Sequence, residues 1–332
     1  MQYLNQPLVV KGYELGNRLV LPPMATSRGD ENGQVTPQIL EYYDDKTRGG
    51  YIGLVITEHS FVSQEGMANK RQMSVSRDED IPGLKQLAKT IHTNGSIAVA
   101  QISHAGSSSK KSVTGENSVG PSAVDFDNRP TPDHELTVAE IQVLVRKFAD
   151  AARRCVEAGF DGVEIHAAHG YLLNQFYSPL TNKREDEYGG DVFGRIKFHL
   201  EVIQAIRREI GREALLLLRL GAIDDCEGGN TVEDAVVAAK VFEEAGVDIL
   251  DISGGMTGIM IRGREKQQGY FSQETERLKH EICIPVLLTG GITDAAAAED
   301  ILQKGQADLI GVGRAILKDS QWARRVFASE AF

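Results

Sequence analysis

Residues 163–182 read VEIHAAHGYLLNQFYSPLTN, and this stretch decides the fold. Its first residues, Val163–His166, are predicted to form a short buried strand, because they follow a helix end and a glycine turn. Polar side chains at His166, His169 and Tyr171 then cluster where the strand gives way to its loop. An α/β enzyme binds a polar substrate with groups placed in this way, at the carboxyl ends of its parallel strands.

Similar short apolar runs recur along the whole chain, and each is predicted to be a strand. They are rich in Val, Ile and Leu with little polar alternation, which is the pattern of strands covered on both faces. The runs are Leu19–Pro22, Leu54–Thr57, Ile97–Ile102, Val163–His166, Leu215–Leu220, Ile249–Ile252, Pro285–Leu288 and Leu309–Val312.

Helices are predicted between these strands, and several carry start signals, such as the capping box that Thr137 forms with Glu140. The segments are Pro37–Arg48, Pro82–Asn94, Thr137–Ala158, Phe193–Ile210, Thr231–Ala245, Ser272–Glu281, Asp294–Lys304 and Ala315–Asp319. The succession of strand–helix units predicts an α/β fold of the (β/α)8 TIM-barrel type. A doubly wound open sheet is the alternative, but its phosphate motif G-x-G-x-x-G is missing after the first strand.

The composition describes a chain that can bury a large core, with 332 residues of which 41% are hydrophobic and 25% charged. No Pro/Ser-rich linker divides it, so we expect one domain over residues 1–332. The net charge of −11 argues against nucleic acid or an anionic membrane surface as the main partner.

Three scattered cysteines, Cys155, Cys226 and Cys283, form no C-x-x-C pair, so neither an iron–sulfur cluster nor a structural zinc site is expected. Unpaired cysteines suit a reducing cytoplasm. The N-terminus shows no secretory signal, and no apolar run approaches the roughly 20 residues of a membrane span. We therefore expect a cytoplasmic protein.

Three long segments follow predicted strands, at Ser103–Glu135, Ala167–Gly190 and Gly254–Tyr270, and should lie together on the C-terminal face of the barrel. Where the second of them begins, His166 at the end of the strand and His169 in the loop could be a metal pair, buried structural histidines, or two N–H donors that polarise one acceptor oxygen. Their position at a strand end favours the donor pair.

Polar residues inside the apolar strands are expected to lie in the barrel interior, beneath this face. Glu164 shares the inward side of its strand with His166. A buried carboxylate needs a cation or a donor beside it, so Glu164 is either part of the site or part of a structural polar layer inside the barrel. Arg219 interrupts the run Leu215–Leu220 and is expected to face a bound anion. Gln101 could bond the amide-like edge of a heterocycle or simply be a satisfied core residue.

Glycine turns close the last two strands, with Gly290 and Gly291 after one, and Gly313 followed by Arg314 after the other. Backbone N–H groups in these loops commonly cradle phosphate in barrels. Groups that could bind a phosphate, a group that could bond a heterocycle edge and a pair of donors together indicate a phosphorylated flavin lying across the barrel mouth.

Four motifs then identify a family resemblance: NRLVLPPM at 17–24, QISHAG at 101–106, HAAHGYLLNQFYSP at 166–179 and GVGR at 311–314. The sequence resembles the old yellow enzyme family of FMN-dependent ene-reductases, also called NADH:flavin oxidoreductases. The resemblance implies the same barrel, a hairpin around Leu8–Leu15 that closes its base, FMN as cofactor, and NADH or NADPH as co-substrate.

The resemblance also implies roles for individual positions. Pro23, Met24 and Ala25 would contact the flavin ring. Gln101 would bond its pyrimidine edge, and Arg219 would neutralise its N1/O2 region. The phosphate would be held by Gly290, Gly291, Gly313 and Arg314. His166 and His169 would bind the carbonyl or nitro oxygen of an activated alkene. Tyr171 would protonate the carbon next to that group, in a ping-pong reaction that delivers hydride from flavin N5 to the β carbon.

Two positions depart from the family pattern. Ala25 stands where relatives often carry threonine or cysteine, and His59 stands near the flavin where relatives usually have a small residue. The chain stops at Phe332, so we expect the single-domain form, without the iron–sulfur and second-flavin domains of dienoyl-CoA reductases.

Other functions remain to be compared with this one. A stand-alone dienoyl-CoA or 2-enoate reductase is the nearest alternative. A tRNA-dihydrouridine synthase would be expected to be basic, and an aldolase or isomerase would need a catalytic lysine, for which only Lys266 lies in a suitable loop. The expected partners are a small-molecule electron acceptor and further copies of the chain in a homo-oligomer.

Overall fold

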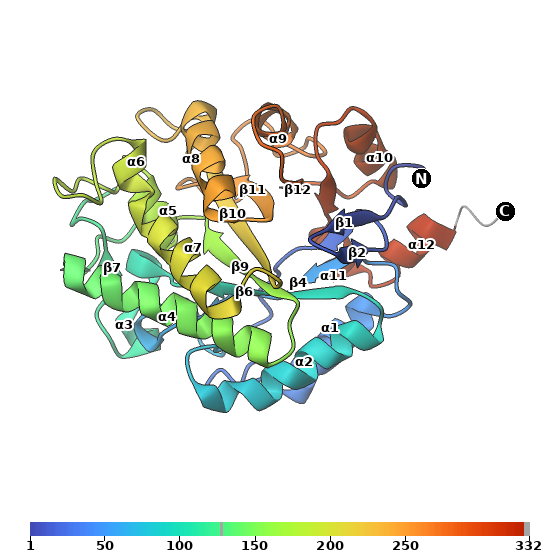
Figure 1. Cartoon of the computed structure of the whole chain (residues 1–332), viewed down its shortest axis with the longest axis horizontal. Helices are drawn as coiled ribbons and strands as arrows, with labels where there is room; N and C mark the ends of the chain where they lie inside the picture. Colours follow the sequence, from blue (N-terminus) through green and yellow to red (C-terminus); the bar gives the residue numbers. More distant parts are fainter. Residues whose placement is uncertain (127–128, 329–332) are drawn as a thin grey trace.

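The computed structural model of the chain describes residues 1–126 and 129–328. Parallel strands of this part of the chain form a closed barrel, because each pairs with its neighbours and β13 returns to β3 (Figure 1). Its strands are β3 (Leu19–Leu21), β4 (Leu54–Ile56), β6 (Ile97–Ser103), β9 (Gly162–Ala167), β10 (Leu215–Ile223), β11 (Ile249–Gly254), β12 (Val286–Thr289) and β13 (Leu309–Gly311). The predicted (β/α)8 barrel is confirmed, with each predicted strand within a few residues of its observed bounds.

Helices cover the outside of the strands (Figure 1). The helices of the described residues are α1 (Pro37–Thr47), α2 (Ile81–Thr93), α3 (Lys111–Thr114), α4 (Val138–Glu157), α5 (Leu172–Tyr177), α6 (Val192–Arg195), α7 (Lys197–Ile210), α8 (Val232–Ala245), α9 (Ser272–Lys279), α10 (Ala295–Gln303), α11 (Arg314–Lys318) and α12 (Trp322–Ala328). Of these, α3 and α5 belong to the long loops after β6 and β9. Short strands β5 (Ser60–Phe61), β7 (Val119–Gly120) and β8 (His134–Glu135) lie in the loops.

The single helix predicted over Phe193–Ile210 is wrong in one respect, because the chain breaks it at Ile196 into α6 and α7. The break has a local cause. Asp191 caps α6 by accepting a hydrogen bond from the Gly194 N–H, and the guanidinium of Arg195 donates to the carbonyls of Tyr177 and Gly190. These bonds tie α6 to the loop that follows β9.

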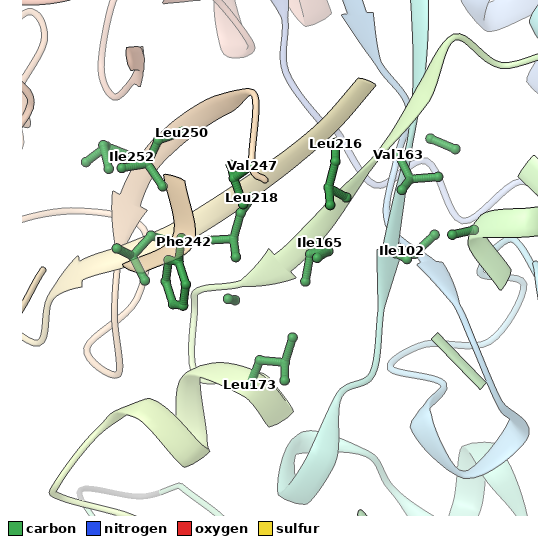
Figure 2. Close-up of a cluster of buried hydrophobic side chains, with 14 of the residues drawn as sticks. Ile102, Val163, Ile165, Leu173, Leu216, Leu218, Phe242, Val247, Leu250 and Ile252 are labelled. Carbon is green, nitrogen blue, oxygen red and sulfur yellow. The ribbon is translucent and has the colours of Figure 1, made fainter. Parts of the chain in front are cut away.

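Alternate residues of each strand face two separate cores. Leu215 and Leu217 of β10 point into the barrel, whereas Leu216 and Leu218 pack against the helices. Figure 2 shows Leu216 and Leu218 on either side of Ile165 of β9, with Phe242 of α8 on the Leu218 side. Because both faces are buried, each leucine contributes roughly 1.5–3 kcal/mol, and the strand reads as a continuous apolar run.

The N-terminal hairpin closes the base of the barrel, as the resemblance implied. Strands β1 (Leu8–Val10) and β2 (Tyr13–Leu15) pair antiparallel around Lys11 and Gly12, which both have positive φ. Val10 and Leu15 join the inner core, so they plug the end of the barrel opposite the long loops.

The long loops after β6, β9 and β11 meet on the other face, as predicted. The Leu172 N–H donates to the His104 carbonyl at 2.9 Å, and the His169 N–H donates to the Gly254 carbonyl at 3.0 Å. Within the described residues, none of the helices combines the length and apolar character of a membrane span.

Candidate active site

A cavity of about 140 Å³ opens on the loop-bearing face, and most of the predicted site residues line it. The lining includes Pro23, Met24, His169, Arg219, Gly290, Gly291, Gly313 and Arg314 from the predicted set. Segments that follow β3, β12 and β13 therefore meet the loop after β9, as the barrel topology requires. Ala25 is exposed beside Met24 and does not line this cavity.

Beside the cavity, the rings of His166, His169 and Tyr171 lie against one another. The His166 ring centroid is 5.0 Å from that of His169 and 4.9 Å from that of Tyr171. His169 has φ 61°, a left-handed conformation that is uncommon outside glycine and often marks a functional site. Its Nε2 lies 2.7 Å from the Ser253 hydroxyl, which fixes the ring orientation.

The surroundings keep both imidazoles neutral. Burial lowers the pKa of His166 and His169 well below the ordinary value, and the positive charge of Arg219 adds to the effect. Burial also raises the pKa of Tyr171 to about 12. At neutral pH the cluster therefore offers imidazole N–H donors and a phenol that retains its proton.

No group of three or more His, Cys, Asp or Glu side chains among the described residues could hold a metal ion. His166 and His169 therefore lack a third ligand in this part of the chain. The Nδ1 atom of His166 is buried without a hydrogen-bond partner, so one donor or acceptor position is left for a ligand.

A buried polar layer lies beneath the cluster, inside the barrel. The Gln101 Nε2 donates to Glu164 Oε1 at 2.8 Å, and Arg219 Nε lies 3.3 Å from Asp251 Oδ2. Burial and the negative charge of Asp251 raise the pKa of Glu164 well above its usual range, while Arg219 opposes that shift. Gln101 therefore sits below the cavity rather than in its lining.

Sequence reasoning missed Asp251 as the partner of Arg219. The two residues are paired across β10 and β11 in the register of the sheet. An aspartate within the apolar run Ile249–Ile252 was the available signal, because an unpaired charge there would be costly. Ser253, which orients His169, lies on the same strand and was missed as well.

The glycines of the last two strand ends are required by close packing. A Cβ atom added at Gly291 would lie 2.6 Å from the Tyr270 ring, and one at Gly313 would lie 2.7 Å from the Met24 sulfur. Gly291 also has φ 72°, which favours glycine. Tyr270 thus forms one wall of the cavity, which the sequence did not reveal.

The charge of this cavity suits an anionic ligand. Arg314 lines it and forms no ion pair within residues 1–126 and 129–328. Burial raises the pKa of the Tyr270 phenol, but the positive charges of Arg314 and Arg219 both act against that rise. Two guanidinium groups therefore act on one small cavity. These residues fit a phosphorylated flavin, whose phosphate Arg314 and the glycine turns would hold.

His59 does not line this cavity but extends the ring cluster. Its ring centroid lies 5.6 Å from that of Tyr171 and 6.3 Å from that of His166. The structure thus places His59 on the side of the predicted acceptor site, whereas the sequence assigned it to the flavin.

Comparison with known proteins agrees with this geometry. A family model described as the NADH:flavin oxidoreductase / NADH oxidase family matches residues 3–330. The NADH oxidase of Thermoanaerobacter brockii is 38% identical over 314 residues, covering 93% of this chain and 48% of that protein. The NADPH dehydrogenase of Halalkalibacterium halodurans is 36% identical over 317 residues, covering 95% of this chain and 91% of that protein. The chain thus spans about half of the first relative and most of the second.

Solved structures resemble the chain over nearly its full length. A 2-naphthoyl-CoA reductase in complex with 2-naphthoyl-CoA superposes with a TM-score of 0.93 at 28% identity, covering 99% of this chain and 52% of that one. An old yellow enzyme homologue from Zymomonas mobilis superposes with a TM-score of 0.84 at 27% identity, covering 98% of this chain and 92% of that one.

Proposed function

The chain belongs to the NADH:flavin oxidoreductase / NADH oxidase family, and from this premise we propose that it is an FMN-dependent ene-reductase. It would carry hydride from NADH or NADPH to the β carbon of an activated alkene such as an enone, enal or nitroalkene. The single observation that supports this most is the cluster of neutral His166, His169 and Tyr171 beside a glycine-lined, cationic cavity. We further propose that residues 1–332 form one FMN-binding barrel domain.

Bound FMN supplies the hydride transfer at its N5 atom, and the protein supplies positions and charges. Arg314 and the backbone around Gly290, Gly291 and Gly313 would hold the phosphate. Arg219 would supply positive charge that favours the reduced flavin. Pro23 and Met24 would contact the ring, Ala25 would do so from beside Met24 outside the cavity, and Gln101 would support the pyrimidine edge from the polar layer.

The acceptor is polarised by two N–H donors. His166 and His169 bind the carbonyl or nitro oxygen and stabilise the negative charge that develops there as hydride reaches the β carbon. Tyr171 then gives its phenolic proton to the α carbon, and solvent returns a proton to the tyrosine. NAD(P)H and the acceptor would use the same site in turn, which predicts ping-pong kinetics.

A second candidate acceptor is an unsaturated acyl thioester of coenzyme A. The structural neighbour that binds 2-naphthoyl-CoA favours it, because that protein superposes with a TM-score of 0.93. In this chain Ile259, a half-exposed residue of the loop after β11, lines the cavity, and it would offer an apolar surface to a longer acceptor.

The first test is whether the purified protein carries FMN and reduces cyclohex-2-enone with either nicotinamide. The double variant His166→Ala/His169→Ala should retain FMN and oxidise NAD(P)H at a similar rate. Its kcat/KM for cyclohexenone should fall at least 100-fold, since one donor to a developing oxyanion contributes roughly 2.7–4 kcal/mol. Unchanged turnover of the enone would refute the assignment of the histidines, and a colourless protein without flavin would refute the function as a whole.

A further inference from the structure

The hydrogen bonds around Gln72 fix which nitrogen of His59 carries a proton. The Ala68 N–H donates to Gln72 Oε1 at 2.7 Å, so the amide nitrogen of Gln72 faces His59. That nitrogen donates to His59 Nδ1 at 2.8 Å and to the His59 carbonyl at 3.0 Å. An amide nitrogen cannot accept a hydrogen bond, so Nδ1 is the acceptor and the proton lies on Nε2.

The Nε2–H group of His59 is available for a ligand. Within residues 1–126 and 129–328, hydrogen bonds reach only the Nδ1 atom of this ring, and Nε2 is not among the buried unpaired atoms. Nε2 therefore opens onto accessible space. Burial lowers the pKa of His59 to about 4, so the ring is a neutral donor at pH 7.

The position of His59 determines to which oxygen of a bound acceptor it can donate a hydrogen bond. His166 makes ring contacts with both His169 and His59, at centroid distances of 5.0 and 6.3 Å. In the part of the chain described, no ring contact joins His59 and His169, whereas each of them has a ring contact with His166. An oxygen held between His166 and His169 would thus already have its two donors, and His59 would be left for a different oxygen.

We propose that His59 is a specificity-determining residue that donates its Nε2–H to a second carbonyl oxygen of the acceptor. The inference rests on the proposed function and concerns its selectivity: His59 adds to the discrimination of alkenes activated by two carbonyl groups, such as conjugated enediones, from simple enones. A neutral donor suits a neutral carbonyl oxygen, and a site built for that bond discriminates against a ligand that lacks it.

The test compares two acceptors that differ by one carbonyl, cyclohex-2-ene-1,4-dione and cyclohex-2-enone, with the FMN-loaded enzyme. In His59→Ala, kcat/KM for the dione should fall about tenfold, the effect of one net hydrogen bond, while kcat/KM for the enone changes less than about threefold. His59→Phe keeps a ring of similar size without the donor and should behave in the same way. His280→Ala, at an exposed histidine after α9, is the matched control and should change neither value.

Equal losses with both acceptors, or no loss with either, would overturn the proposal. A wild-type enzyme that oxidises NAD(P)H but reduces neither acceptor contradicts the ene-reductase function itself, and the inference falls with it. Nitrogen-15 NMR of histidine-labelled holoenzyme is a readout independent of turnover. Wild-type His59 should show the Nε2–H tautomer at pH 7, and a protonated Nδ1 would overturn the proposal.

Discussion

Arg219 has two tasks at the scale of single residues, because it faces the cavity and also compensates the buried carboxyl of Asp251. Replacing it with leucine should therefore do more than weaken FMN retention. It leaves Asp251 buried without a cation, and breaking a buried pair in this way costs about 3–5 kcal/mol. Urea unfolding of the FMN-free protein should show a loss of that size.

The double variant Arg219→Leu/Asp251→Asn separates the two tasks. It removes both charges, so most of the stability should return, while FMN content and the rate of flavin reduction remain low. Arg219→Lys is the matched control, since it keeps the charge. Recovery of FMN binding in the double variant would argue against a role for Arg219 at the flavin.

The carboxyl of Glu164 predicts how stability depends on pH. Its pKa is raised in the folded protein by burial and by Asp251, so the folded state holds a proton that the unfolded state releases near pH 4.3. Stability from this group is complete below the unfolded pKa and is lost as pH rises toward the folded pKa. Glu164→Gln keeps an acceptor for Gln101 but cannot titrate.

The variant Glu164→Gln should therefore lose less stability than wild type between pH 5 and pH 8. Denaturant unfolding of the FMN-free proteins at both values measures the difference. Parallel pH profiles for the two proteins would show that Glu164 is charged throughout, with Arg219 compensating it fully.

At the scale of elements, the capping box of α4 offers a local test. The Thr137 hydroxyl accepts from the Glu140 N–H, and Glu140 Oε2 accepts from the Thr137 N–H at 2.7 Å. Thr137→Ala should destabilise the protein by about 1 kcal/mol, because the Glu140 N–H in the first turn loses the hydroxyl that accepts its hydrogen bond. Thr137→Ser keeps the hydroxyl and should be close to wild type in urea unfolding, and equal losses in both variants would contradict the capping explanation.

Strands and long helices could be predicted from sequence because their signals are local. A run such as Leu215–Leu218 is apolar at every position, which only a strand covered on both faces explains. The break at Ile196 could not be predicted, since it accompanies hydrogen bonds from Arg195 to the carbonyls of Tyr177 and Gly190, which the apolar pattern of the segment does not reveal. The short helix α12 was also missed, although Asp319 and Ser320 just before it are residue types that often begin helices.

At the scale of the whole molecule, the barrel explains why residues far apart in sequence meet. Every barrel strand ends at the same face, so a residue predicted at a strand end, such as His166 or Gly291, was already placed near the others. Contacts across the barrel were not predictable in this way. Tyr270 reaches Gly291 from the loop after β11, and His59 reaches Tyr171 from the β4–β5 connection, because loop conformations position them.

The glycine cradle connects the stability of the entire barrel to its cofactor. A ligand that binds only the folded state stabilises it by about 2.7 kcal/mol when present at 100 times its Kd. Because Arg219 of β10 and segments after β3, β9, β11, β12 and β13 all line the cavity, FMN would tie together much of the barrel. Added FMN should therefore raise the melting temperature of the wild-type protein.

Gly291→Ala should abolish most of that increase. The new Cβ would lie 2.6 Å from the Tyr270 ring at a residue with φ 72°, so the loop must shift where the phosphate is expected to bind. Gly16→Ala, at a glycine whose added Cβ would have no neighbour within 4 Å, is the control and should keep the full FMN-dependent shift. If Gly291→Ala melts lower than wild type but still gains the same stabilisation from FMN, the strain is local. The phosphate must then be held elsewhere on the barrel mouth.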